Sequence, residues 1–92
     1  MTKQNTDTGA LVTALGLAVQ GRRKKLGLSQ DDLAAKAGLH RTYISEIERR
    51  SRNLSVKILV RLAMALDLSP SQLLLVAEKI ADDELAPSGT DS

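Results

Sequence analysis

The chain has 92 residues, the length of one small domain, and its 42% of hydrophobic residues suffices for a single core. With no cysteine, phenylalanine or tryptophan and one tyrosine, that core has to be aliphatic, and disulfides, cysteine-containing zinc sites and thiol catalysis are excluded. The net charge at pH 7 is only +2, so the positions of the charges are more informative than their sum.

The spacing of apolar residues predicts an all-α fold of five helices, because these residues recur with the helical period and nowhere alternate as in a strand. The predicted helices cover residues 10–26, 30–37, 41–49, 56–66 and 70–85. They form one predicted domain at 10–86, between a flexible N-terminal arm at 1–9 and a flexible tail at 87–92. Gly27 and Gly38 follow the first two helices, where a left-handed residue commonly ends a helix.

Four of the predicted helix starts share one pattern, a leucine just before the N-cap and another apolar residue five positions after that leucine. The pairs are Leu28 and Leu33, Leu39 and Ile44, Leu54 and Leu59, and Leu68 and Leu73. This is the spacing of a hydrophobic staple. Ser29 with Asp32, and Ser69 with Gln72, also resemble capping boxes, whereas His40 is a poor N-cap residue.

Residues 30–49 predict two short helices joined by a tight turn at Gly38, which can take the positive φ that a sharp turn requires. Ala34 lies where the two helices would meet, and its small side chain allows a close approach. Ile44 and Ile47 then belong to a shared apolar seam between the helices.

The opposite face of the second of these helices is polar. It carries Arg41, Thr42, Ser45, Glu46 and Arg49. A helix that presents arginine and hydroxyl groups at its N-terminal end can read base edges in a DNA major groove.

Charge is distributed unevenly along the chain. Residues 21–61 contain eleven Lys/Arg and four Asp/Glu, whereas residues 78–92 contain five acidic residues and one lysine. The basic middle predicts a surface that faces a polyanion, with the acidic end kept away from it. The alternative interpretation is an ordinary solvated surface.

Over about residues 15–75 the chain resembles the Cro/C1-type (XRE-like) helix-turn-helix regulators, through GLSQDDLAAKAGL, YISEIER and LVRLAMALDLSPSQLL. The stretch RTYISEIER, followed by Arg52 and Asn53, is especially similar to restriction–modification controller proteins. The resemblance implies a transcriptional regulator that binds double-stranded DNA sequence-specifically. Its third helix would enter the major groove of a pseudo-palindromic operator.

The resemblance also implies roles for individual residues. Gln30 would bond a phosphate or brace the recognition helix, and Tyr43 would lie against the sugar-phosphate backbone or a flexible base step. Arg41 and Thr42 would face bases. The residues expected to flank these contacts, on the backbone or on adjacent bases, are Ser45, Arg49, Arg52 and Asn53.

Arg23 and Glu48 match a pair that forms a salt bridge between the first and third helices in this family, neutralising an acid beside DNA and orienting the arginine toward phosphate. Two positions depart from the family pattern. Arg50 replaces a usual glycine, so either a left-handed backbone there costs roughly 1 kcal/mol or the loop takes another path and changes the aim of Arg52. Arg22 replaces a residue that is often apolar, and it either reaches phosphate or lays its stem along the protein surface.

Several of these residues have a plainer interpretation. Tyr43 would then be a packing residue. His40 is either an indifferent cap or a contact to a base or phosphate, and Glu46 either an exposed helical charge or a participant in base choice. Residues 22–25 either contact phosphate or form a solvated helix end that complements the helix dipole.

The last predicted helix has more apolar residues than one buried stripe needs. That stripe would be formed by Leu73, Val76, Ala77 and Ile80. Leu74 and Leu75 would then point away from the core, and we expect them to form the interface of a homodimer. The same patch would also suit an additional protein partner.

No catalytic or metal-binding pattern is evident, since the sequence shows no nucleophile–base pair, no phosphate loop and a lone histidine. No aliphatic run approaches the roughly 18 residues of a membrane helix, and the N-terminus lacks the order of a signal peptide. We therefore predict a cytoplasmic protein that is not an enzyme, needs no cofactor or metal, and contacts no membrane. The alternative function is an antitoxin-like protein-interaction module with autoregulatory DNA binding.

Overall fold

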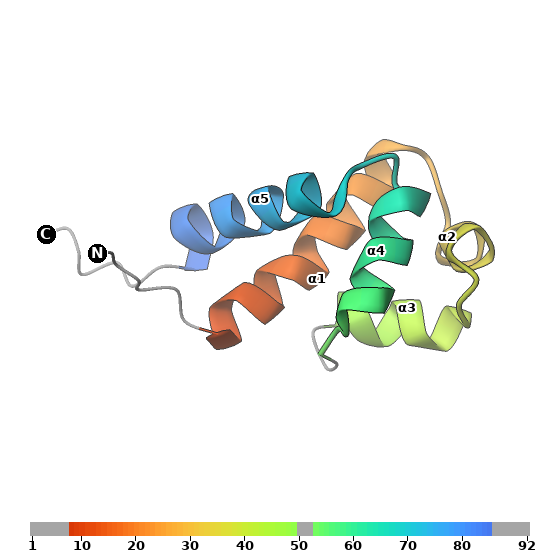
Figure 1. The fold of residues 1–92 in the computed structure, drawn as a ribbon, viewed down its shortest axis with the longest axis horizontal. Helices are drawn as coiled ribbons and strands as arrows, with labels where there is room; N and C mark the ends of the chain where they lie inside the picture. The colour runs from red at the N-terminus through yellow and green to blue at the C-terminus, as the bar shows by residue number, and fades with distance from the viewer. Residues whose placement is uncertain (1–7, 50–52, 86–92) are drawn as a thin grey trace, which may run out of the picture.

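The computed structural model of the chain describes residues 8–49 and 53–85, and within them it contains helices and no strand (Figure 1). The helices are α1 (Thr8–Lys25), α2 (Gln30–Ala37), α3 (Arg41–Glu48), α4 (Val56–Ala65) and α5 (Pro70–Ile80), and a π-helical segment (Ala81–Leu85) continues α5. The predicted all-α fold of five helices is therefore confirmed. Four helices begin at the predicted residue, while α1 begins at Thr8, inside the predicted N-terminal arm. The rest of that arm and the predicted tail at 87–92 lie outside the described residues.

The helix starts follow from local sequence. Ser29 Oγ accepts a hydrogen bond from the Asp32 amide at 2.9 Å, and Asp32 Oδ2 accepts one from the Ser29 amide at 2.9 Å. Ser69 and Gln72 form the same reciprocal box, with bonds of 3.1 and 2.8 Å. The bonds from Ser29 lower the pKa of the Asp32 carboxyl. His40 makes no side-chain capping bond, as its residue type predicted.

Three helix ends close in one way, with a leucine amide donating to a carbonyl five residues earlier. The bonds are Leu28 to Arg23 at 3.0 Å, Leu39 to Ala34 at 2.9 Å, and Leu68 to Ala63 at 2.9 Å. The residue before each leucine is left-handed: Gly27 with φ 74°, Gly38 with φ 70°, and Asp67 with φ 60°. Because each leucine also precedes the next N-cap, one left-handed residue and one leucine suffice to end a helix and start the next.

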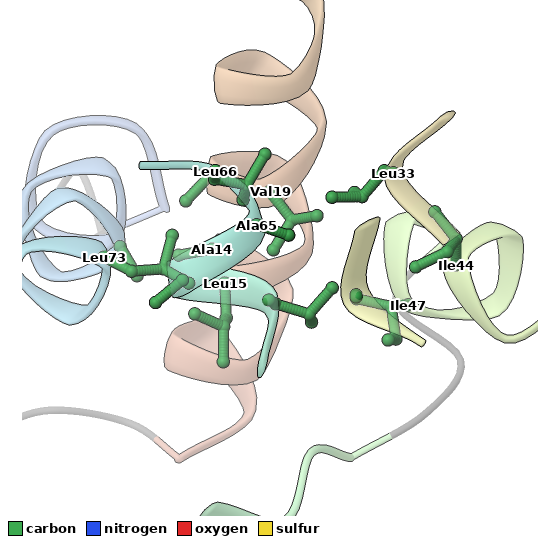
Figure 2. Packing of buried hydrophobic residues seen from close by; sticks show 14 of the residues in the cluster. Ala14, Leu15, Val19, Leu33, Ile44, Ile47, Ala65, Leu66 and Leu73 are labelled. Atoms are coloured by element: carbon green, nitrogen blue, oxygen red, sulfur yellow. The ribbon is translucent and has the colours of Figure 1, made fainter. Parts of the chain in front are cut away.

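The helices enclose one aliphatic core. α1 and α5 lie side by side, α2 packs against α3 and α4, and α3 also contacts α1 (Figure 1). The largest fully buried side chains are Leu33, Ile44, Ile47, Leu62, Leu66, Leu73 and Val19, and those labelled in the close view point into shared space (Figure 2). The predicted seam between α2 and α3 is thus part of the core, which fixes how α3 is presented.

The predicted buried face of α5 was partly wrong. Leu73 and Ala77 are fully buried as expected, but Val76 is 43% exposed, and Leu74 packs partly against the core. Ala81 joins the buried row instead, because the face that meets α1 follows the four-residue spacing from Leu73. Leu75 is 65% exposed, in agreement with its predicted outward position.

In the ranges 8–49 and 53–85, no single helix combines the length and apolar character needed to cross a membrane. α4 and the helical stretch Pro70–Asp83, which are bent by 95° relative to each other, satisfy length and composition only when taken together.

Candidate nucleic-acid interface

The outer face of α3 and the segments beside it carry most of the residues predicted to contact DNA. Ile44 and Ile47 are 0% and 2% exposed, so the helix turns its opposite side outward. The predicted contact residues that are exposed are His40, Arg41, Thr42, Arg49 and Asn53. Those that are half-buried are Gln30, Tyr43, Ser45 and Glu46. Arg52, and the unusual Arg50, lie outside the described residues.

Arg23 and Glu48 form the predicted ion pair between α1 and α3. Arg23 Nε donates to Glu48 Oε2 at 2.6 Å, and Arg23 Nη2 donates to Glu48 Oε1 at 2.9 Å. The third nitrogen, Nη1, donates to the Leu28 carbonyl at 2.9 Å. The two side chains are only 10% and 1% exposed, so this paired contact is inside the protein and fixes the last turn of α3 against α1.

Gln30 completes this buried group from α2. Its Nε2 donates to Glu48 Oε1 at 3.1 Å, so one carboxylate receives bonds from both α1 and α2. Of the two roles expected for Gln30, the structure shows the second, a hydrogen bond that holds α3 in place.

Burial of the Glu48 carboxyl opposes its ionisation, but the hydrogen bonds from Arg23 and Gln30 outweigh burial and lower the pKa of Glu48. The same hydrogen bond with Glu48, partly offset by burial, raises the pKa of Arg23. The pair is therefore charged at neutral pH, and α3 is fixed by charge-assisted bonds.

Arg41 is the first residue of α3 and leans toward α2. Its Nε lies 3.5 Å from Oδ1 of Asp31, and both side chains are exposed, by 61% and 77%. Asp31 could not be singled out from the sequence, because an acid in the first turn of a helix is ordinary. At the other end of α3, Arg49 Nη1 donates to Ser45 Oγ at 2.7 Å, which steers this arginine along the exposed face.

An open hollow of about 540 Å³ lies at the junction of α2 and α3. It is lined by Gly38, Leu39, His40, Thr42, Tyr43 and Glu46. Tyr43 packs against the core with one side and borders this hollow with the other, so packing and an outward contact are compatible.

Arg22 has a structural partner that sequence analysis missed. Its Nε donates to the Leu66 carbonyl at 2.9 Å, at the C-terminal end of α4. A cation that bonds a terminal carbonyl is favoured by the helix dipole. This contact gives Arg22 a structural role at a position that is often apolar in the family.

Among the described residues, no group of three or more histidine, cysteine or acidic side chains is arranged to hold a metal ion.

A sequence profile described as helix-turn-helix matches residues 19–73, which is more than half of the chain. The chain belongs to the helix-turn-helix family. The matched region of this helix-turn-helix protein contains α2 and α3 together with the Arg23–Glu48 pair.

The relatives confirm the predicted similarity to controller proteins. "Control protein C.SmaI" of Serratia marcescens is 46% identical over 56 residues, covering 61% of this chain and 67% of that protein. "Control protein C.BamHI" of Bacillus amyloliquefaciens is 46% identical over 55 residues, covering 60% of this chain and 68% of that protein.

A solved tetramer of the restriction–modification controller protein C.Esp1396I, in complex with its natural 35 base-pair operator, aligns with a TM-score of 0.74 and 36% identity. The alignment covers 79% of this chain and 96% of that one. The helix-turn-helix protein therefore matches nearly the whole of one chain of a structure that was solved on DNA.

The buried pair predicts a specific acid dependence of stability. Because the pKa of Glu48 is lowered from its ordinary 4.5, its contribution is complete above about pH 4.5 and is lost as the pH falls through the folded-state value. Glu48→Gln should lower the free energy of unfolding by about 3 kcal/mol at pH 7, since Arg23 loses its buried ionised partner. The difference in the free energy of unfolding between wild type and variant should become steadily smaller as the pH falls below 4.5.

Urea unfolding monitored by circular dichroism between pH 3 and pH 7 measures this difference. The half-buried Glu46→Gln is the matched control, and we expect its difference from wild type to stay within about 1 kcal/mol at every pH. A difference for Glu48→Gln that is the same at both ends of the range would contradict the assigned pair.

Proposed function

We propose that the chain is a transcriptional regulator that binds double-stranded DNA sequence-specifically, with α3 in the major groove. The observation that carries this proposal is the exposed N-terminal end of α3, where Arg41 and Thr42 project from a helix fixed from behind by Arg23 and Glu48. A helix held at a defined angle can repeat the same base contacts at each binding event. The relatives named as control proteins, and the operator-bound C.Esp1396I structure, support the same function.

We propose different DNA contacts for different residues around α3. Arg41 and Thr42 read base edges, while Arg49 and Asn53 position the protein on the backbone. Lys24 and Lys25, both exposed at the end of α1, add attraction to phosphate that does not depend on sequence. Arg23 contributes by fixing α3, since its three nitrogens donate to Glu48 and to the Leu28 carbonyl.

We also propose a homodimer built on α5. Leu75 is 65% and Val76 43% exposed, and both are apolar, so a second copy of the chain would remove them from water. Leu74 is already partly packed against the core, and its remaining exposed surface would belong to the same dimer interface. A two-fold dimer would read half-sites separated by about one helical turn, roughly 34 Å. An antitoxin-like module would use the same surface for a foreign partner, and no feature of the described residues favours that alternative.

We propose further that the chain catalyses no reaction, needs no cofactor and acts in the cytoplasm. This assignment rests on family membership and on a surface suited to a polyanion.

Base reading and general attraction can be separated by two substitutions. Duplexes first have to be selected from a random library with the wild-type protein. Arg41→Ala should weaken binding to the selected duplex by about 1–3 kcal/mol and relax the preference at one base position. Lys24→Ala should weaken all duplexes alike and reduce the slope of log affinity against log salt by about 1. Anisotropy titrations at several salt concentrations measure both, and an Arg41→Ala protein with wild-type preferences would remove Arg41 from the readers.

The dimer is tested by charge on the exposed face of α5. Leu75→Glu should convert the dimer to monomer, because each leucine loses roughly 1.5–3 kcal/mol of burial and the two new charges oppose each other. Met64→Glu is the control, since Met64 is similarly exposed at 67% but lies on α4. Sedimentation should give the wild-type mass for Met64→Glu and half of it for Leu75→Glu. Equal masses for the two folded variants would place the interface elsewhere.

A further inference from the structure

The side chain that contacts Arg41 belongs to α2 and has no role in the proposed function so far. Asp31 lies in the first turn of α2, one residue after Gln30, which is itself bonded to Glu48 at the end of α3. The capping box uses Asp32, so the Asp31 carboxylate is not needed to start the helix. Its Oδ1 is 3.5 Å from Arg41 Nε.

The atom through which Arg41 pairs with Asp31 decides what the arginine can still do. The contact is made by Nε, which leaves the two terminal amino groups as donors. Those terminal groups form the fork that contacts O6 and N7 of guanine. Arg41 can therefore keep its pair with Asp31 while it contacts a guanine in the major groove.

A contact between Arg41 and a phosphate differs from its contact with guanine. In a complex without the correct base, the strongest attraction for Arg41 is the phosphate backbone. While the pair is kept, a phosphate contact brings the Asp31 carboxylate, which is 77% exposed, close to the backbone, and its negative charge opposes that contact. Arg41 also lies at the N-terminal end of α3, where the helix dipole is positive. The negative charge of Asp31 offsets this positive charge.

We propose that Asp31 is a specificity-determining residue that acts through Arg41. It orients the guanidinium for a bidentate contact to guanine and lowers the affinity for DNA that lacks this guanine. The proposal rests on the proposed function, because it requires Arg41 to read a base.

The test uses two duplexes, one selected from a random library by the wild-type protein and one with the same composition in shuffled order. The measured quantity is the specificity ratio, the affinity for the selected duplex divided by the affinity for the shuffled one. Asp31→Ala should strengthen binding to the shuffled duplex and lower this ratio about two- to fivefold, the range of an exposed ion pair. Asp82→Ala, which removes an exposed carboxylate after α5, is the control for net charge and should leave the ratio unchanged.

A second background separates a positioning role from a local structural one. In Arg41→Ala protein, the further change Asp31→Ala should leave the ratio where Arg41→Ala put it. Asp31→Asn, which preserves the shape of the first turn of α2, should lower the ratio in the same direction as Asp31→Ala. Circular dichroism melting curves establish that each variant is folded.

The inference is overturned if Asp31→Ala changes the ratio no more than Asp82→Ala does, or if its effect is equally large without Arg41. A wild-type protein that selects no preferred duplex would instead overturn the proposed function, and this inference with it.

Discussion

Arg23 and Glu48 join the C-terminal end of α1 to the last turn of α3 through two hydrogen bonds of 2.6 and 2.9 Å. Gln30 adds a bond from α2 to the same carboxylate, and Arg23 also holds the Leu28 carbonyl in the link between α1 and α2. Three helices therefore meet at one buried carboxylate. The buried side chains of α3 place it against the core, and the forked arginine–carboxylate contact, which is satisfied in few orientations, adds a directional constraint. The pair thus determines the angle at which α3 faces outward.

The exposed side of α3 depends on that buried side. Because Ile44 and Ile47 are held in the core and Glu48 is fixed, Arg41 emerges at a constant position beside Asp31. α5 lies apart from α2 and α3 (Figure 1), and its Leu75 is 65% exposed. In the function we propose, base reading and dimerisation therefore use separate surfaces of one domain.

Local contacts could be predicted from the sequence, and long-range ones only where a family resemblance supplied them. The capping boxes at Ser29 and Ser69 depend on residues three positions apart, so their patterns are visible in the chain. Asp67 in a left-handed conformation could not be predicted, because glycine is the usual signal. The bond from Arg22 to Leu66 joins residues 44 positions apart and depends on how α1 meets α4. The buried face of α5 was misassigned at Val76, because helical spacing allows either row until α1 selects one.

The central claim is that the buried pair orients α3 and does not chiefly supply stability. The double replacement Arg23→Met/Glu48→Leu tests it, because apolar residues of similar volume can replace a buried ion pair without loss of stability, whereas each single change costs about 3–5 kcal/mol. The decisive measurement is the affinity of the folded double variant for the duplex selected by the wild type. This account predicts wild-type or higher stability with an affinity lower by about tenfold or more, some 1.4 kcal/mol. A stable double variant that binds the selected duplex as tightly as the wild type would contradict it.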